Sequence, residues 1–216
     1  MEPKKISKSV LKRLPGYLAY LKNMPDTAPT HISATALANA LGMGEVQVRK
    51  DLAMVSDGGR PKIGYLRTAL IDDIEQFLGY DNTTDAVLIG AGKLGQALMA
   101  YKGFDEYGLN ILAAFDARPK MEKTEEGKPV YHINRLDQFC RTHKVLMGII
   151  TVPAEAAQSV ADQLIAGGIK AIWNFAPVHL DVPAGTLVQN ENMATSLAVL
   201  SVHLQAQIKE EKDTKK

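Results

Sequence analysis

The sequence predicts an α/β protein with a helical N-terminal third, a central domain built on a parallel sheet, and a long C-terminal helix. Three observations support this prediction. Apolar residues recur at steps of three and four up to about residue 67, continuous apolar runs begin near residue 85, and a narrow apolar seam lies near the end of the chain. The first pattern is typical of amphipathic helices and the second of strands covered on both faces. We therefore divide the chain into residues 1–80, 81–190 and 191–216.

Length and composition are those of an ordinary globular protein. The chain has 216 residues, and 46% of them are hydrophobic, which is enough to bury a core. No apolar run is long enough to cross a bilayer, and the first residues, MEPKKISKSV, lack the apolar stretch of a secretory signal. We therefore expect a cytoplasmic protein with no membrane partner. The single cysteine, Cys140, has no partner for an internal disulfide, and we interpret it as a half-buried helix residue rather than a redox thiol.

Charge is distributed unevenly along the chain. Residues 1–67 carry 11 Lys and Arg against 5 Asp and Glu, whereas the rest carries 14 against 19. A basic segment joined to a mildly acidic body is typical of a module that binds a polyanion, although lysine-rich surfaces also occur without any ligand. Nucleic acid is therefore a candidate partner of the N-terminal third.

The first amphipathic stretch is SKSVLKRLPGYLAYLKNM. Its apolar stripe consists of Val10, Leu11, Leu14, Leu18, Leu21 and Met24. Because proline lacks an amide hydrogen and its ring crowds the preceding turn, we expect this helix to break or kink near Pro15 and Gly16.

Two shorter helices follow in HISATALANALGMGEVQVRKDLAMVS. Ser33 is a suitable N-cap for the first, Gly42 and Gly44 frame a tight turn, and Glu45 opens the second with an acid in its first turn. The sequence therefore predicts a helix-turn-helix.

The second of these helices has the composition of a recognition helix. We expect it to bury Val46, Leu52 and Val55 and to project Gln47, Arg49 and Lys50 outward. Recognition helices present such side chains to the major groove of DNA, where Arg and Gln suit base edges and Lys suits phosphates.

A glycine-rich turn and a short β-prone stretch come next, in DGGRPKIGYLRT. We interpret them as a small hairpin that carries Arg60 and Lys62, like the wing of a winged helix. Together with the basic excess, the hairpin favours DNA binding. The alternative is a three-helix packing module whose lysines are only solvated.

The central domain alternates apolar runs, AVLIG, ILAAF, VLMGIITV and KAIWNFA, with helical stretches. This alternation is typical of a doubly wound, Rossmann-type parallel sheet. In GAGKLGQAL, Gly90 permits a tight turn, Gly92 lets the backbone approach a pyrophosphate, and Gly95 lets the helix pack closely on the strand. The amides at the helix N-terminus then face the phosphates.

An acid ends the second strand of this domain. Asp116 lies 21 residues beyond Gly95, where a carboxylate accepts hydrogen bonds from the adenosine ribose and repels a 2′-phosphate. The position favours NAD(H) as the ligand. Arg118, two residues later, keeps NADP(H) as an alternative because a guanidinium there suits a 2′-phosphate.

The sequence contains no recognisable catalytic group. The histidines His132, His143, His179 and His203 are scattered, and none pairs with an acid or lysine in a known pattern. There is no metal-ligand cluster, and we interpret Trp173 as a partly buried aromatic residue on a strand. We therefore expect a protein that is not an enzyme and holds no metal.

The C-terminal stretch ENMATSLAVLSVHLQAQIKEEK carries a narrow apolar seam. Its members are Met193, Leu197, Leu200, Leu204 and Ile208. The seam either packs back onto its own domain or joins a second subunit, and we favour a homodimer because it would align two recognition helices with two operator half-sites.

The chain contains, in order, the segments VQVRKDL, GYL, LIGAGKLGQAL, YKGF, ITVPAEAAQ and GIKAIWNFAPV. Through these segments, nearly the whole chain closely resembles the Rex family of NADH-responsive transcriptional repressors. The resemblance implies a homodimer that exchanges its C-terminal helix, binds a palindromic operator when NADH is scarce, and leaves it when NADH accumulates.

The resemblance also implies site residues. The adenosine and pyrophosphate positions are Gly90, Ala91, Gly92, Lys93, Leu94, Gly95 and Asp116, and those near the nicotinamide are Tyr101, Phe104, Thr151, Val152, Pro153, Asn174 and Phe175. Of the predicted DNA-contacting residues Gln47, Arg49, Lys50, Arg60 and Lys62, the resemblance places Arg49 and Lys50 on the recognition helix.

Several positions depart from the family pattern. Pro61 and Lys62 replace the usual wing residues, so the operator sequence is open. Many members also pair a tyrosine near the nicotinamide with an aspartate and an arginine that align with Asn192 and Ala19 here. Two alternatives to a redox-sensing repressor therefore stay open: an oxidoreductase or CoA-binding domain with an interaction module, and a DNA-binding protein that has lost its ligand response.

Overall fold

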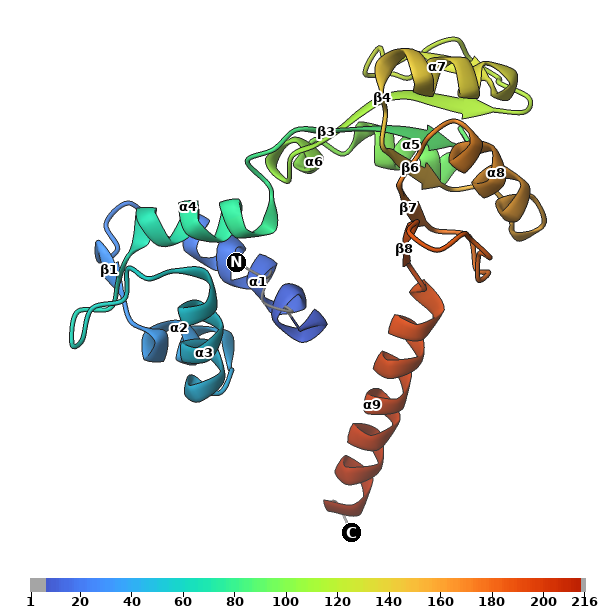
Figure 1. The fold of residues 1–216 in the computed structure, drawn as a ribbon. Coiled ribbons are helices and arrows are strands. Elements are labelled where there is room, and N and C mark those ends of the chain that lie inside the picture. The colour runs from blue at the N-terminus through green and yellow to red at the C-terminus, as the bar shows by residue number, and fades with distance from the viewer. Residues whose placement is uncertain (1–6, 215–216) are drawn as a thin grey trace. The chain divides into compact units, whose positions relative to one another are not determined.

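The computed structural model describes residues 7–214, and the chain divides into two compact units (Figure 1). One unit comprises Met1–Thr83 with Glu106–Gly108, and the other comprises Thr84–Asp105 with Leu109–Lys216. Residues 1–6, on which the expectation of no secretory signal partly falls, lie outside the described residues. Each unit has a hydrophobic core of its own.

The N-terminal unit contains four helices and a two-stranded sheet within its described residues. The helices are α1 (Lys8–Lys22), α2 (Ala34–Leu41), α3 (Glu45–Val55) and α4 (Arg67–Leu78), and the antiparallel strands are β1 (His31–Ile32) and β2 (Tyr65–Leu66). Of the expected break or kink in the first helix, the break is wrong, because α1 continues through Pro15, and the kink stays a prediction. Burial of Leu14, Tyr17 and Leu18 around the proline compensates the lost backbone hydrogen bond.

The helix caps that the sequence predicts for the helix-turn-helix are confirmed. Ser33 precedes α2 and accepts a hydrogen bond from the Ala36 amide at 3.0 Å. Gly42 ends α2 at a positive φ of 63°, a conformation that favours glycine, and Gly44 precedes α3. The tight turn is therefore determined by residues that lie close together in the sequence.

The buried face of α3 differs from the expected one. Val46 is 65% exposed, whereas Val48, Asp51 and Leu52 are almost fully buried and Val55 is half-buried. Residues 48, 51, 52 and 55 follow the helical period, so the core-facing stripe runs through an aspartate that the apolar pattern could not include.

The second unit is built on a six-stranded parallel sheet. Its strands are β3 (Thr84–Ile89), β4 (Leu109–Asp116), β5 (Val130–His132), β6 (Met147–Ile150), β7 (Ala171–Asn174) and β8 (Leu187–Asn190). The order β5-β4-β3-β6-β7-β8 reverses between β3 and β6, which is the strand order of a Rossmann-type sheet. The two edge strands β5 and β8 were not evident as apolar runs, because both are short and largely polar or exposed.

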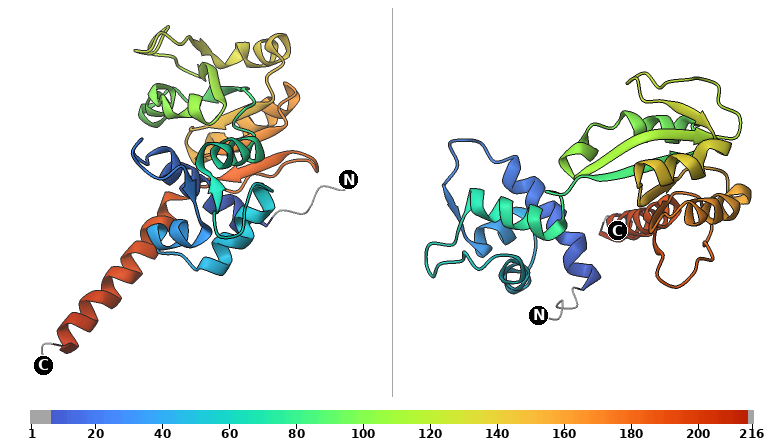
Figure 2. Two further views of the ribbon diagram at one scale, coloured as in Figure 1. Left: turned by 90° about the vertical axis from the view of Figure 1, so that its left-hand side faces the viewer. Right: turned by 45° about the horizontal axis from the view of Figure 1, so that its top comes forward.

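Helices cover both faces of this sheet (Figures 1 and 2). The helices α7 (Leu136–His143) and α8 (Ala154–Ala166) share one core with the sheet, and α5 (Lys93–Ala100) packs on the opposite face. The short α6 (Gly103–Glu106) and a 3₁₀ turn (Ile133–Arg135) complete the connections. Cys140 lies on α7 and is fully rather than half-buried, and burial raises the pKa of its thiol to about 11. Such a thiol is unreactive at neutral pH, in agreement with a structural role.

The C-terminal helix α9 (Met193–Thr214) keeps its apolar seam exposed. Met193, Leu197 and Leu200 are each 64–67% exposed, so the alternative in which the seam packs onto its own domain is wrong. Val199 and Val202 are also exposed, and they lie on other sides of the helix. Among the helices within residues 7–214, none combines the length and the apolar character needed to cross a membrane.

Candidate functional site

The recognition helix presents polar side chains to solvent. Gln47, Arg49 and Lys50 are all exposed on α3, as the sequence predicts. Arg49 forms an ion pair with Glu45 one turn earlier, so its guanidinium is held along the helix surface. The same helix thus offers a fork-shaped donor and a lysine side by side, a combination suited to base edges and phosphates.

A partly buried ion pair holds α3 against α1. The Asp51 carboxylate accepts two hydrogen bonds from Arg13, at 2.7 Å from Nε and 2.9 Å from Nη2, and a third from the Tyr17 hydroxyl at 2.8 Å. Asp51 is 2% exposed and Tyr17 is fully buried. A bidentate contact restricts both distance and angle. The orientation of α3 therefore depends on these three side chains.

The charge state of this cluster is well defined. Burial alone would raise the pKa of Asp51, but the hydrogen bonds from Arg13 and Tyr17 outweigh it and hold the pKa below its usual value. Burial and the neighbouring carboxylate raise the pKa of Tyr17 to about 12. At neutral pH the carboxylate is therefore ionised and the phenol is a hydrogen-bond donor.

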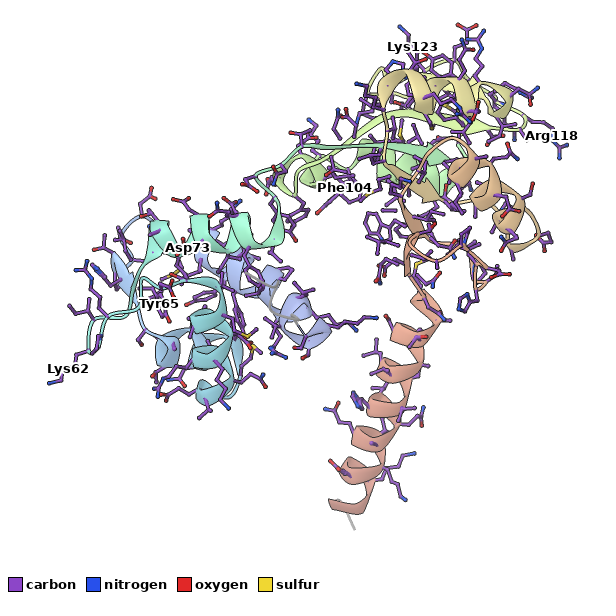
Figure 3. All side chains as sticks on the ribbon, in the orientation of Figure 1. Lys62, Tyr65, Asp73, Phe104, Arg118 and Lys123 are labelled. Carbon is purple, nitrogen blue, oxygen red and sulfur yellow. The ribbon has the colours of Figure 1, made fainter. Side chains whose placement is uncertain are left out.

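The predicted wing is a tight hairpin. Arg60 and Gly64 pair across its tip, with both amide-to-carbonyl distances at 2.9 Å. Lys62 lies at the tip with a positive φ of 66°, a conformation that costs energy for any residue with a Cβ. Figure 3 shows its side chain pointing away from the unit.

A hollow of about 410 Å³ lies between α3, the start of α2 and the wing. Its lining includes Arg49, Arg60 and Lys62 together with Ser33 and Thr35. Three of the five predicted DNA-contacting residues therefore share one basic, hydroxyl-lined surface. Hydroxyl and guanidinium groups are the usual donors to phosphate oxygens.

The glycine-rich loop lies at the point where the strand order reverses. Gly90 directly follows β3 with φ at 105°, and a side chain there would collide with Thr151, which directly follows the neighbouring strand β6. The Thr151 hydroxyl donates toward the Ile89 and Gly90 carbonyls, at 3.0 and 2.8 Å. A side chain at Gly95 would strike the Gly90 carbonyl, so this glycine is required by close packing. The loop is therefore fixed by β3, α5 and β6 together.

Gly92 occupies a different environment, because a Cβ there would meet no atom within 4 Å. It precedes α5, and Lys93 and Leu94 in the first turn are exposed. The first amides of a helix have no partner inside the helix, and they carry its positive dipole end. This open, glycine-flanked helix start is therefore suited to a phosphate group.

Asp116 lies where the sequence places it, at the end of β4. Its carboxylate accepts hydrogen bonds from the Ala91 amide at 2.9 Å and the Arg118 amide at 2.8 Å. These contacts hold the acid beside the glycine-rich loop. The Arg118 side chain points away from the unit in Figure 3.

An aromatic row lines one face of the sheet, formed by Tyr101, Phe104, Trp173 and Phe175. Neighbouring ring centroids in this order are 4.9, 5.6 and 4.9 Å apart. Trp173 is half-buried, which confirms its interpretation as a partly buried strand residue, and Tyr101 is 52% exposed. The row thus has an open end at Tyr101 and a packed end on the sheet.

Asn174 is fully buried, and its side chain forms hydrogen bonds with neighbouring residues of its own unit. Its Nδ2 donates to the Val178 carbonyl and to Asn190 Oδ1, both at 2.9 Å, and its Oδ1 accepts from the Ala176 amide at 3.0 Å. The side chain therefore shapes the loop after β7. A direct contact between Asn174 and a cofactor stays a prediction.

The remaining predicted residues have simpler environments. Val152 is partly buried against the α7–α8 core, and Pro153 precedes α8. His143 stacks on Phe139 at 3.9 Å, and His132 and His179 bond to nearby main-chain groups. Within residues 7–214, no group of three or more His, Cys, Asp or Glu is placed to hold a metal ion.

Comparison with known proteins identifies the family. A family model described as "Putative DNA-binding protein N-terminus" matches residues 5–53, and one described as "CoA binding domain" matches residues 81–178. The redox-sensing transcriptional repressor Rex of Porphyromonas gingivalis is 42% identical over 197 residues, which cover 91% of this chain and 90% of that protein. The repressor of the same name from Clostridium botulinum is 40% identical, covering 94% and 98%. This chain belongs to the Rex family.

Solved structures agree with this family. The Rex-family repressor RSP in complex with β-NAD⁺ and operator DNA has a TM-score of 0.87 at 32% identity, covering 97% of both chains. RSP in complex with β-NADH has a TM-score of 0.84 at the same identity, covering 97% of this chain and 99% of that one. The Rex relatives are repressors by name, in agreement with the expectation that the chain is not an enzyme.

The sequence did not predict the buried and half-buried side chains that hold the functional elements in place. Asp51, Arg13 and Tyr17 orient the recognition helix, and the only sequence signal is an acid on the buried stripe of α3. The hydrogen bond between Trp173 and Glu191 had no sequence signal, because 18 residues separate the two.

Proposed function

We propose that this Rex-family chain is a homodimeric repressor that binds a palindromic operator and is released when NADH binds its Rossmann-type unit. The observation that carries the proposal is the Asp116 carboxylate, bonded at 2.9 Å to the Ala91 amide of the glycine-rich loop. A carboxylate in this place accepts the ribose hydroxyls of an NAD-type dinucleotide. The protein would thereby read the ratio of NADH to NAD⁺.

The nucleotide would lie across the carboxyl ends of β3 and β6. The pyrophosphate would face the Gly92 end of α5, and the nicotinamide would reach Tyr101 and Phe104 at the open end of the aromatic row. NAD⁺ carries a positive charge on its ring, and a pocket with an apolar wall makes desolvation of that charge costly. We therefore expect NADH to bind more tightly than NAD⁺.

DNA would bind the N-terminal unit through α3 and the wing. Gln47, Arg49 and Lys50 would enter the major groove, and Arg60 and Lys62 would contact the backbone beside it. The hollow lined by Arg49, Arg60 and Lys62 supports this assignment, since it concentrates positive charge on one surface.

The exposed helix α9 supports a second copy of the chain as partner. Its seam is Met193, Leu197, Leu200, Leu204 and Ile208, and Val199 and Val202 add apolar surface elsewhere on the helix. A helix that is apolar on several sides is normally buried in a larger core. Exchange of α9 between two copies would cover these sides and set the spacing of the two recognition helices.

The first test is operator binding by fluorescence anisotropy. A labelled inverted repeat is titrated with protein at fixed salt, with NADH, NAD⁺, NADPH or no nucleotide. Release by NADH alone is expected. Tight binding that no nucleotide changes would instead favour a DNA-binding protein without a redox response, for which the neutral residues Ala19 and Asn192 are the motivation.

The second test concerns the choice between NADH and NADPH. Replacement Asp116→Ala removes the acceptor and the negative charge, so NADH should lose its advantage over NADPH while operator binding without nucleotide is unchanged. Calorimetric titration of both nucleotides measures this. Arg118→Ala is the matched control, and a wild-type preference for NADPH that Arg118→Ala removes would overturn the assignment to NADH.

A further inference from the structure

A hydrogen bond joins the aromatic row to the segment that leads into α9. Trp173 donates its indole N–H to the Glu191 carboxylate, with 2.9 Å between Nε1 and Oε1. The indole has one donor and no acceptor, and an ionised acceptor makes the bond stronger than a neutral one would be. Both side chains are half-buried, which limits competition from water.

Glu191 is also fixed through its main chain. Its amide donates to the Asn174 carbonyl at 2.8 Å, directly after the residue pair Asn174 and Asn190 that joins β7 to β8. Glu191 is therefore attached to β7 twice, by its backbone next to Trp173 and by its carboxylate to Trp173 itself. A shift of the Trp173 ring against this fixed backbone would strain the carboxylate bond first.

The helix α9 begins directly after this point. Asn192 caps the helix, since its Oδ1 accepts from the Thr195 amide at 3.2 Å, and α9 starts at Met193. A negative charge just before a helix is favourable because it faces the positive end of the helix dipole. The Glu191 carboxylate, which also accepts from Gln189 Nε2 at 3.5 Å, thus belongs to the residue directly before the N-cap of α9.

The other end of the row faces the proposed nicotinamide position. Phe104 contacts both Tyr101 and Trp173 edge to face, with ring planes at 79° and 70°. Edge-to-face contacts fix the relative orientation of rings, so a ligand that displaces Phe104 must reorient Trp173 or break the contact. Rings in close contact transmit such shifts because protein interiors have few voids.

We infer that Glu191 is a positioning residue, which couples the nucleotide in the Rossmann-type unit to the first turn of α9 through its hydrogen bond with Trp173. This inference rests on the proposed function, because it requires an NADH-responsive repressor. Coupling needs a ligand that binds two states of the protein differently. Here one state keeps the bond between Trp173 and Glu191 and the other stretches it.

The test measures a coupling ratio on the full-length protein, defined as the operator Kd with saturating NADH divided by the operator Kd without nucleotide. The variants are Glu191→Ala, which removes the acceptor, Trp173→Phe, which keeps an aromatic ring without the donor, and the double variant. Glu191→Gln keeps an acceptor oxygen without the charge. Asp162→Asn is the matched control, because it neutralises an exposed acid of the same unit that bonds to Gln158 instead.

We expect Glu191→Ala and Trp173→Phe each to lower the coupling ratio about fivefold or more, within the usual range of allosteric couplings of roughly 5–150-fold. The double variant should lower the ratio no further, because both changes remove one bond. Glu191→Gln should restore part of the ratio, and Asp162→Asn should equal wild type. The melting temperature of Glu191→Gln should stay near the wild-type value.

Two outcomes would overturn the inference while leaving the proposed function intact. One is a wild-type protein that NADH releases from DNA together with variants that respond equally well. The other is additive effects of the two single changes in the double variant. A wild-type protein that binds operator and NADH without any coupling would overturn both the inference and the proposed release by NADH.

Discussion

The two units build their surfaces from different parts of the chain. The N-terminal unit presents side chains, namely Gln47, Arg49 and Lys50, on a helix held by a partly buried ion pair. The Rossmann-type unit presents main chain, since its loop at Gly90–Gly95 offers amides and carbonyls between close-packed glycines. A surface of side chains can change its ligand with one substitution, whereas a surface of main chain depends on the glycines that pack it and that leave the backbone open to a ligand.

The largest effect is expected where the N-terminal unit depends on a single buried charge. Asp51→Ala leaves the Arg13 guanidinium and the Tyr17 hydroxyl without their acceptor, so the free energy of unfolding should fall by about 3 kcal/mol. Urea unfolding measures this fall, and NADH titration should show that the second unit retains its ligand. Asp57→Ala, an exposed acid in the same unit, is the control.

The same carboxylate gives a pH dependence with a defined sign. Because the pKa of Asp51 is lowered in the folded protein, its stabilisation is complete above the ordinary value of 3.8 and is lost as the pH falls through the lowered pKa. An Asp51→Asn variant should show a flatter acid limb. Equal acid limbs for this variant and wild type would contradict the assignment of the ion pair.

A second comparison concerns two glycines of the same loop, Gly95 and Gly92. Gly95→Ala places a methyl group against the Gly90 carbonyl and should cost about 1–3 kcal/mol of stability. Gly92→Ala meets no atom within 4 Å, so it should keep the stability and lose NADH affinity by blocking the approach of the pyrophosphate. Thermal unfolding and calorimetric titration separate the two. Unchanged NADH affinity in Gly92→Ala would place the phosphates elsewhere.

The exposed face of α3 should show effects of a similar or smaller size. Arg49→Ala should cost about 1–3 kcal/mol on the cognate operator and little on unrelated DNA, if the guanidinium reads a base edge. Lys50→Ala should weaken binding to all sequences alike and reduce the salt dependence. Anisotropy titrations at several salt concentrations measure both. Indistinguishable behaviour of the two variants would remove the distinction between base contact and phosphate contact.

The smallest effect is expected for a matched pair of lysines, one in each unit. Lys62 on the wing and Lys144 after α7 are the non-glycine residues at positive φ within the described chain, with φ at 66° and 53°. Replacement of either by glycine should relieve strain and change stability by at most about 1 kcal/mol. Only Lys62→Gly should weaken operator binding and lower its salt slope. A loss of operator affinity in Lys144→Gly as well would trace the effect to stability rather than to DNA contact.

The Rossmann-type unit was the easier of the two to predict. Its determinants are local, because each apolar run is continuous in the sequence and because the spaced glycines and Asp116 all lie within residues 90–116. The caps Ser33, Gly42 and Gly44 were predictable for the same reason. Local chemistry dictates these conformations, whatever packs against them later.

The features that escaped prediction depend on contacts between distant residues. Arg13 and Asp51 are 38 residues apart, and the apolar period of α3 pointed to Val46 instead of Asp51. The break expected at Pro15 did not occur, since tertiary burial of Tyr17 and its neighbours outweighs the local preference of proline. The hydrogen bonds of the Asn174 side chain inside its own loop were not foreseen either, and its contact with a cofactor stays a prediction.

The uncovered apolar sides of α9 have a genetic consequence under the proposed exchange of helices. A copy with an intact α9 but a damaged recognition helix would still form dimers with normal copies. These mixed dimers would have only one intact recognition helix for an operator with two half-sites. Such an allele would therefore be dominant over the normal one. An allele truncated before Met193 would be recessive instead, because its product could not enter the pairs at all.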